Sequence, residues 1–336
     1  MAARRRPLLA LAAGLLVSAA AIWILSASVD VAAASTVLAG ARIERLLPVT
    51  AILALQFVVR TFRWSRLAVA LRTDPPLPVA RFAGPLAIGY LGNAVLPARL
   101  GEVLRAAVLG RAEGVPVAAV LGTVLVERIV DTLTLAALAG VVAAIVAPGW
   151  IAGLATFVAV AAVAVLIGLV TIGRAAARTI GAGTNPRLEP LSTIGGGAVR
   201  DVANAVDRIP HRALAVAVAL SVVAWLCDGA LFWTVSWSVG VDVAPATAFL
   251  VAAVTVLATA VPASPGYVGT FEAAAVGAGV ALGIAPGNGL AIAVLAHACA
   301  TIPLAGLGGI AALRLGLRRS DVTAARGGSP AVVAVR

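Results

Sequence analysis

Three ionisable side chains lie in the middle of one long apolar stretch. In "TVLVERIVDTLT", residues 123–134, Glu127 and Asp131 are four residues apart and share one helix face, while Arg128 reaches Asp131 at a separation of three. Each such charge in the middle of a membrane span costs roughly 2.5 to 3.5 kcal/mol on insertion scales. The polar face is therefore expected to point into the protein interior.

A neighbouring stretch, "GNAVLPARLGEVLRAAVL", supplies Arg99, Glu102 and Arg105. Together with the first three groups they give three positive and three negative charges, which could form a neutral network. Arg99 and Arg105 suit a bidentate grip on a lipid phosphate, because guanidinium geometry matches phosphate oxygens. The alternative for Glu127 and Asp131 is a salt-bridged scaffold that binds no ligand.

Proline and glycine interrupt the apolar run near Pro97, and a similar break follows in "TAVPASPGYVGTFE", residues 259–272. Pro97 and Gly101 have the spacing of Pro265 and Gly269. Non-helical backbone at membrane depth is tolerated only where protein buries it or water reaches it. The two breaks therefore predict a polar site, and two ordinary kinked helices are the alternative. The predicted substrate-binding residues are Asn93, Pro97, Arg99, Gly101, Glu102, Arg105, Glu127, Arg128, Asp131, Pro262, Ser264, Pro265, Gly266, Gly269 and Glu272.

Two further sets of side chains have candidate roles. Arg60 and Arg63, with Trp64 beside them, are predicted to collect lipid headgroups, although arginines that merely anchor the span at the headgroups fit the same pattern. In the second half, Glu272 and His297 are candidates for a proton relay, because an apolar setting favours a neutral carboxyl group. A histidine satisfied within the core is the plainer interpretation.

The overall composition indicates that membrane-spanning helices position these groups. The 336 residues are 62% hydrophobic and 12% charged, with a mean hydropathy of +1.07, whereas soluble domains are about 25% charged. The sequence predicts an all-α polytopic membrane protein of about six full spans and up to eight membrane segments. A secretory signal is the alternative for the first span. The predicted spans are 8–29, 46–59, 115–147, 150–173, 213–239 and 290–312.

Loop arginines set the predicted topology, because short arginine-rich loops stay in the cytoplasm. Both termini are expected in the cytoplasm, residues 1–7 as a short N-terminus and residues 317–336 as a disordered tail. The linker 174–212 is expected on the same side. This assignment of loops to the two sides of the membrane requires two re-entrant hairpins. Hairpin 82–110 enters from the cytoplasm, and hairpin 246–282 enters from outside. Residues 8–149 and 150–316 then form an inverted-topology repeat, and in transporters so built the breaks meet at the binding site.

Several chemistries are excluded by residue counts. The chain contains no lysine, so it can carry neither a Walker A motif nor a lysine Schiff base. Two cysteines and two histidines predict no metal site and no structural disulfide. A net charge of +11 is assigned to loops facing anionic lipid rather than to nucleic acid. No catalytic residue, cofactor or metal is predicted.

The segments "GNAVLPARLGEVLRAAVL", "ERIVD", "RTFRW" and "PASPGYVGTFEAA" together resemble the flippase-like transmembrane domain of lysylphosphatidylglycerol synthases, over roughly residues 8–316. In that family this domain is held to move an aminoacylated lipid between leaflets. The attached aminoacyltransferase domain does not appear in the sequence, which is similar to the stand-alone form. Such relatives are associated with glycolipid, hopanoid or polyprenyl-linked glycan pathways.

These observations predict a non-enzymatic lipid flippase in the plasma membrane of a bacterial cell. Its substrate would be a phospholipid, glycolipid or polyprenyl-linked lipid, with a homo-oligomer or a partner enzyme that makes the lipid as expected associates. Two alternatives stay open, a non-transporting lipid-binding subunit of a membrane enzyme and an intramembrane lipid transferase. The headgroup, the direction and the energy source do not follow from the residues.

Overall fold

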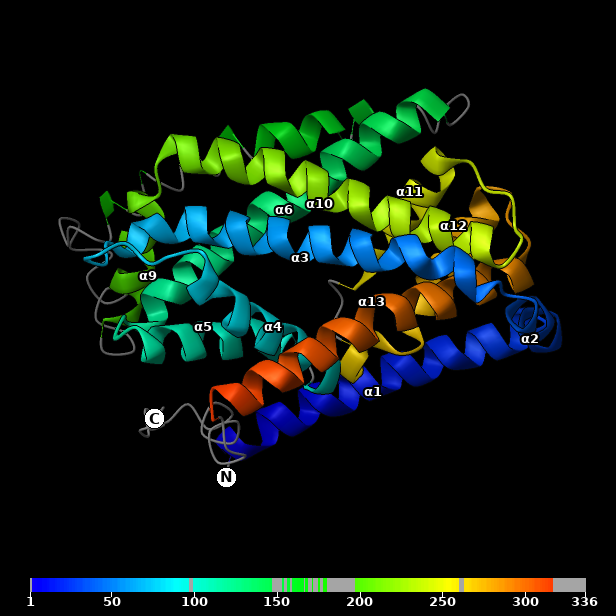
Figure 1. The fold of residues 1–336 in the computed structure, drawn as a ribbon, viewed down its shortest axis with the longest axis horizontal. Coiled ribbons are helices and arrows are strands. Elements are labelled where there is room, and N and C mark those ends of the chain that lie inside the picture. Colours follow the sequence, from blue (N-terminus) through cyan, green and yellow to red (C-terminus); the bar gives the residue numbers. More distant parts are fainter. Residues whose placement is uncertain are drawn as a thin grey trace.

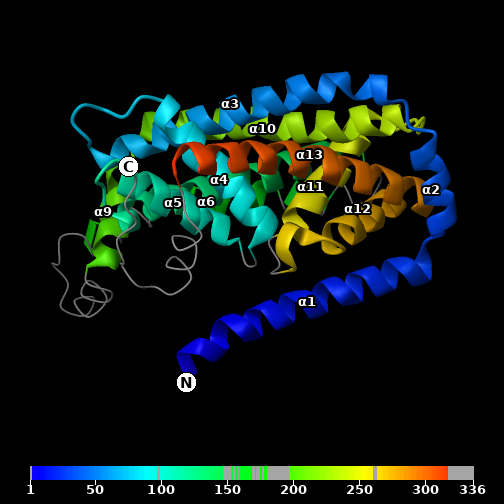
Figure 2. The ribbon, with the colours of Figure 1, turned by 60° about the horizontal axis from the view of Figure 1, so that its bottom comes forward.

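The computed structural model describes residues 2–96, 99–146, 197–259 and 263–316, with scattered helical residues between 153 and 179. The described residues form helices and no strand, which confirms the predicted all-α membrane fold (Figures 1 and 2). The α-helices are α1 (Ala2–Ser28), α2 (Val31–Ala39), α3 (Leu47–Leu67), α4 (Ala80–Val95), α5 (Leu100–Ala112), α6 (Val117–Val146), α9 (Ala198–Arg208), α10 (His211–Ser238), α11 (Pro245–Ala258), α12 (Thr270–Ala281) and α13 (Pro286–Arg314).

Four described helical segments are long and apolar enough to cross a membrane, namely 43–71, 117–146, 211–238 and 286–314. Helices α1 and α2 meet at 88° and add a fifth candidate if the bent pair forms one span. Asp30 caps α2 at the bend by accepting the Ala33 N–H at 3.0 Å. The predicted span 150–173 lies largely outside the described residues, as do much of linker 174–212 and the whole tail 317–336. The predicted number of six full spans stays a prediction.

Both predicted hairpins are helix pairs whose helices end at the breaks. α4 ends at Val95, and Leu96 is extended as the residue before a proline must be. α5 begins after Arg99, which is left-handed at φ 55°. In the second hairpin a 3₁₀ turn, η3 (Pro265–Tyr267), separates α11 from α12, with Gly266 at φ 69° and Tyr267 at φ 59°. Pro97 and Pro262 lie outside the described residues.

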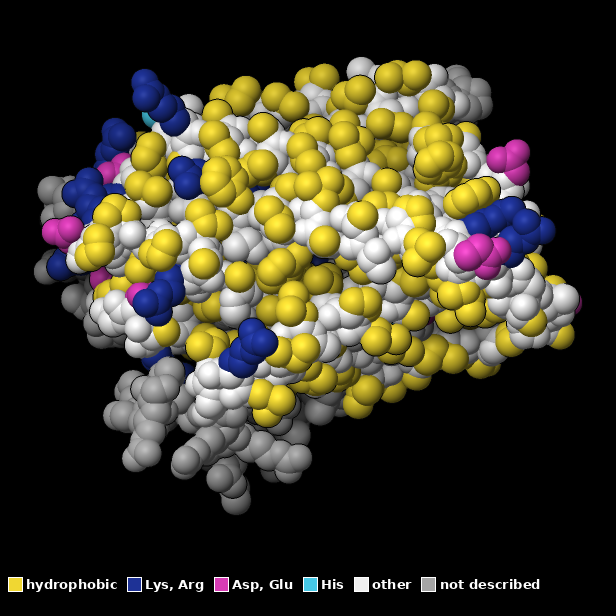
Figure 3. Space-filling view, viewed as in Figure 1, with side chains coloured by type: hydrophobic (Ala, Val, Ile, Leu, Met, Phe, Trp, Pro, Cys, Tyr) yellow, Lys and Arg dark blue, Asp and Glu magenta, His cyan; other side chains and the backbone are white. Residues whose placement is uncertain are grey.

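The two hairpins start from opposite ends of the molecule and meet at its centre (Figure 1). Helices α3, α6, α10 and α13 run along the long axis, with α4 and α5 at one end and α11 and α12 at the other (Figure 1). The meeting is direct, because a Cβ atom on Gly266 would lie 3.3 Å from the Ala94 carbonyl oxygen. On the face shown in Figure 3, apolar side chains cover the middle and charged side chains gather toward both ends, as for a protein surrounded by lipid.

The two halves correspond at an offset of 168 residues. Adding 168 to the bounds of α6 gives 285–314, against 286–314 for α13. The same shift moves α5 to 268–280, against 270–281 for α12, and moves α3 to 215–235, inside α10. Residues separated by 168 also touch one another, as Arg60 and Asp228 do. The correspondence supports the inverted-repeat hypothesis, which stays a prediction.

Apolar packing holds the four long helices around this centre. One cluster joins α3, α10, α11, α12 and α13 through side chains such as Leu53, Phe232 and Ile292. A second joins α3 to the first hairpin and α6 through Trp64, Phe82 and Val124. The polar groups of the candidate site come from the same helices, whose close packing holds them in place.

Candidate functional site

Arg63 of α3 is the centre of a buried ion network. Its guanidinium donates to Glu127 Oε1 at 2.8 Å, to both carboxylate oxygens of Asp131, and to Ser221 Oγ at 2.8 Å. The side chains of Arg63 and Glu127 are fully buried and that of Asp131 nearly so. Glu127 and Asp131 therefore do share one interior helix face, and α3 supplies the cation between them.

Arg128 and Arg105 approach the same carboxylates from the other side. Arg128 lies 2.9 Å from Glu127 Oε1, 3.5 Å from Asp131 Oδ2 and 3.7 Å from Glu102 Oε1. Arg105 forms an ion pair of 3.1 Å with Glu127 Oε2, and its guanidinium lies over the Trp64 ring at 4.7 Å. Five of the six groups predicted to form a neutral network are thus brought together, and Arg99 is the exception.

The predicted surface position of Arg63 and Trp64 is wrong. Both are completely buried, and the Trp64 indole donates to Thr123 Oγ1 at 3.2 Å. A patch that collects headgroups needs access from the lipid, which neither side chain has. The reason is that α3 turns this face toward α6, where two carboxylates attract Arg63 into the interior. Arg60, one turn earlier, pairs instead with Asp228 of α10 at 2.9 Å.

Arg99 links the two hairpins and has no carboxylate within 4.0 Å among the described residues. Its Nε donates to the Thr259 carbonyl oxygen at 3.2 Å and its Nη2 to Thr259 Oγ1 at 2.8 Å. Its guanidinium also lies 5.8 Å from the centre of the Tyr267 ring, on the turn of the second hairpin. The turn of the first hairpin therefore holds that of the second through one side chain.

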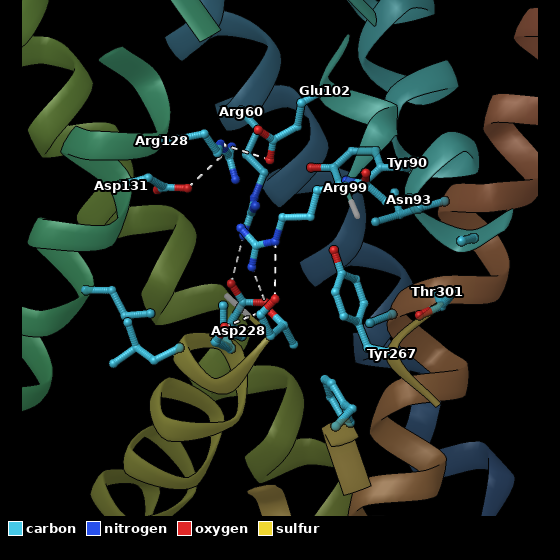
Figure 4. A pocket seen from close by; sticks show the side chains of 18 of the residues that line it. Arg60, Tyr90, Asn93, Arg99, Glu102, Arg128, Asp131, Asp228, Tyr267 and Thr301 are labelled. Atoms are coloured by element: carbon cyan, nitrogen blue, oxygen red, sulfur yellow. Dashed lines mark hydrogen bonds and ion pairs between the residues drawn. The ribbon is translucent and has the colours of Figure 1, made fainter. Parts of the chain in front are cut away.

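A cavity of about 240 Å³ lies where the two turns meet (Figure 4). Figure 4 shows Arg60, Arg99 and Tyr267 around it, with Arg128, Glu102 and Asp131 at one side. Both hairpins and the long helices α3, α6, α10 and α13 contribute to its wall. Its polar and charged lining residues are Gln56, Arg60, Tyr90, Asn93, Arg99, Glu102, Arg128, Asp131, Thr132, Asp228, Thr259, Tyr267 and Thr301.

Other predicted residues shape the turns rather than the cavity wall. Gly101 accepts no side chain, because a Cβ atom there would lie 2.0 Å from the Gly89 carbonyl oxygen, and its N–H donates to Asn93 Oδ1 at 3.1 Å. Ser264 N–H donates to Ser18 Oγ of α1 at 3.1 Å. Pro265 opens η3, and Gly269 precedes α12 at φ 86°. Of the predicted residues at the two turns, Asn93, Arg99 and Gly266 line the cavity directly.

Glu272 and His297 form a separate pair in the second half. Glu272 Oε1 lies 2.6 Å from His297 Nδ1, and Glu272 Oε2 accepts the Gly269 N–H at 2.7 Å. The His297 ring stacks on Phe271, with ring centres 4.2 Å apart, and Phe271 lines the cavity. The pair therefore lies behind one cavity residue and not in the wall itself.

Sequence reasoning missed several lining residues. Gln56, Tyr90 and Thr301 lie inside helices, away from the two turns, and a lone polar residue in an apolar helix is a weak signal. Tyr267 was in the quoted "PASPGYVG" segment and could have been found from its place beside Gly266. In the part of the chain that the structure describes, no group of three potential metal ligands occurs.

The chain belongs to the family of the lysylphosphatidylglycerol synthase transmembrane region, which matches residues 11–308. The family thus covers both hairpins and the whole cavity. The protein "Glycosyltransferase AglD" of Haloferax volcanii is 30% identical over 271 residues, which cover 70% of this chain and 43% of the relative. The chain therefore spans less than half the length of that relative.

Proposed function

We propose that this protein moves a lipid headgroup between the leaflets of the membrane through the central cavity, while the acyl or prenyl chains stay in the surrounding lipid. The family gives a membrane and lipid context. Two hairpins that start from opposite ends of the molecule both contribute to the cavity wall (Figure 1). This arrangement suits a site that opens first to one leaflet and then to the other.

The observation that carries the proposal is the position of Arg99. Its guanidinium lines a cavity of about 240 Å³ at the meeting of the two turns and pairs with no carboxylate among the described residues. Arginine so placed can bind a phosphate oxygen without first breaking an ion pair. Arg60 and Arg63 have carboxylate partners, whereas Arg99 is held by the neutral carbonyl and hydroxyl groups of Thr259, so its charge is not neutralised by a described carboxylate.

A second candidate function follows from the relative named as a glycosyltransferase. Because this chain covers 43% of that relative, it could correspond to a lipid-binding part that presents a substrate to an enzyme. Glycosyl transfer by this chain itself is the third candidate. A sugar product formed by the purified chain alone would support the third, and a stoichiometric enzyme partner without lipid movement would support the second.

The test is lipid translocation in proteoliposomes made with the purified full chain and a panel of labelled lipids. Arg99→Asn removes the charge, and asparagine tolerates the left-handed backbone. The matched control is Arg72→Asn, since Arg72 is an exposed arginine with the same left-handed conformation at φ 51°. We expect Arg99→Asn to reduce translocation at least tenfold and Arg72→Asn to change it less than twofold. Equal rates in both variants, or no translocation by the wild type, would refute the proposal.

A further inference from the structure

The ion network around the cavity contains one more cation than anions. Its arginines are Arg60, Arg63, Arg99, Arg105 and Arg128, and its carboxylates are Glu102, Glu127, Asp131 and Asp228. Every one of the four carboxylates has an arginine within 4.0 Å. Arg60, Arg99 and Arg128 line the cavity, and of these three Arg99 is the one without a carboxylate within 4.0 Å among the described residues, so we assign the excess charge to it.

Hydrogen-bond donors are in excess as well. Arg99 uses two of its five donors on Thr259. Arg105 is only 2% exposed, and its Nη1 pairs with Glu127, but its Nη2 has no hydrogen-bond partner among the described residues. Arg105 lines a small recess of about 30 Å³ that is bordered, like the main cavity, by Asn93 and Glu102. Buried donors without partners favour a ligand that brings acceptors.

The rest of the polar wall is uncharged. Gln56, Asn93 and Thr301 offer amides and a hydroxyl group, while Tyr90 and Tyr267 offer aromatic rings with hydroxyl groups. Amide and hydroxyl side chains both donate and accept, which suits the hydroxyl groups of a glycerol or a sugar. The wall offers no carboxylate free of arginine, which an ammonium group would need.

From these three observations we infer that the cavity selects an anionic headgroup, with one phosphate and an otherwise uncharged, hydroxyl-bearing remainder, and rejects a cationic aminoacyl headgroup. The inference rests on the proposed lipid site and deepens it. An aminoacyl ammonium would leave its charge unpaired beside Arg99, and like charges placed side by side weaken recognition. The charge of the cavity wall therefore disfavours a cationic headgroup as well as favouring an anionic one.

Two lipid sources share the inferred chemistry, a glycerophospholipid such as phosphatidylglycerol and a polyprenyl lipid with a phosphate-linked sugar. The test measures equilibrium binding of radiolabelled dihexanoyl phosphatidylglycerol to the purified full chain in detergent. Unlabelled competitors are its lysyl ester with the same chains, farnesyl phosphoglucose, and dihexanoyl phosphatidylglycerol itself. We expect the lysyl ester to compete at least tenfold more weakly than the parent lipid. Whichever of the two anionic lipids binds more tightly identifies the source.

Arg99→Asn should remove most of this preference, Arg99→Lys should keep it because the charge is retained, and Arg72→Asn should leave it unchanged. A lysyl ester that binds as tightly as its parent, or a preference that survives in Arg99→Asn, overturns the inference. Binding in detergent does not depend on translocation. Selective binding without lipid movement would refute the proposed function alone, whereas movement of both lipids at equal rates would refute the inference alone.

Discussion

The two halves of the molecule place similar helices around the cavity but fill their interiors differently. In the first half, Arg63, Glu127 and Asp131 form a fully buried ion network. The residues 168 positions later are Leu231, Leu295 and Cys299, which belong to or pack against the apolar cluster of the second half. Charge in one half thus corresponds to apolar packing in the other.

This difference bears on whether the charges are a scaffold. A buried ion network is costly to desolvate and is often no more stable than apolar residues of similar volume. The second half shows that the same arrangement of helices packs well without it. Stability alone therefore does not explain why Glu127 and Asp131 are charged. A better explanation is that they hold Arg128, and through it Glu102, at the cavity wall, which both residues line.

The largest expected effect on stability comes from replacing Arg63 by leucine, the residue found at the equivalent position 231 of the second half. Arg63→Leu leaves Glu127 and Asp131 without their central cation, which should cost about 3–5 kcal/mol of stability and most of the folded protein. Adding Asp131→Cys removes one negative charge as well and should recover part of that loss. Thermal unfolding in detergent measures both. If the double variant is less stable than Arg63→Leu alone, the comparison between the halves fails.

An intermediate effect is expected where the halves touch at equivalent positions. Arg60→Gln or Asp228→Asn breaks an ion pair whose side chains are 11% and 19% exposed, and should cost about 2 kcal/mol. The exchange Arg60→Asp with Asp228→Arg should restore at least half of the loss if the two positions are related by a twofold axis. Thermal unfolding of the four proteins checks this, and an exchange variant no better than either single change would count against the axis.

The smallest effect on stability is expected at the Glu272–His297 pair. Glu272→Gln keeps an acceptor for the Gly269 N–H, so stability should fall by about 1 kcal/mol or less. If the pair carries protons, an imposed pH gradient should change wild-type translocation but not that of the variant. Translocation measured with and without the gradient decides. A variant that keeps the full response would leave the pair a structural one.

The ends of helices could be predicted from the sequence, whereas the partners of buried charges could not. Proline and glycine predict the breaks after α4 and α11, because they act on the local backbone. The hairpins 82–110 and 246–282 follow from the loop arginines, which decide the side of the membrane. Arg63 is an example of a buried charge whose partners the sequence does not predict. Its spacing with Arg60 and Arg66 is typical of a headgroup anchor, and only the packing of α3 against α6 reveals that two carboxylates face it.

The lining of the cavity could likewise be predicted only in part. Arg99 and Asn93 were predicted because they stand at a break, where sequence carries a signal. Gln56, Tyr90 and Thr301 come from three different helices and converge only in three dimensions. Convergence of that kind depends on helix rotation and crossing angle, which a hydropathy pattern does not determine in helices that are apolar on nearly every side.

The left-handed backbone at Arg99 and Tyr267 has a consequence for how the sequence can change. Both residues occupy a conformation that glycine or asparagine adopts more readily, at 168 positions from each other in the two turns. Glycine at either position would therefore relax the turn, but it would also remove the guanidinium or the ring from the cavity wall and with it the 5.8 Å contact that joins the two turns.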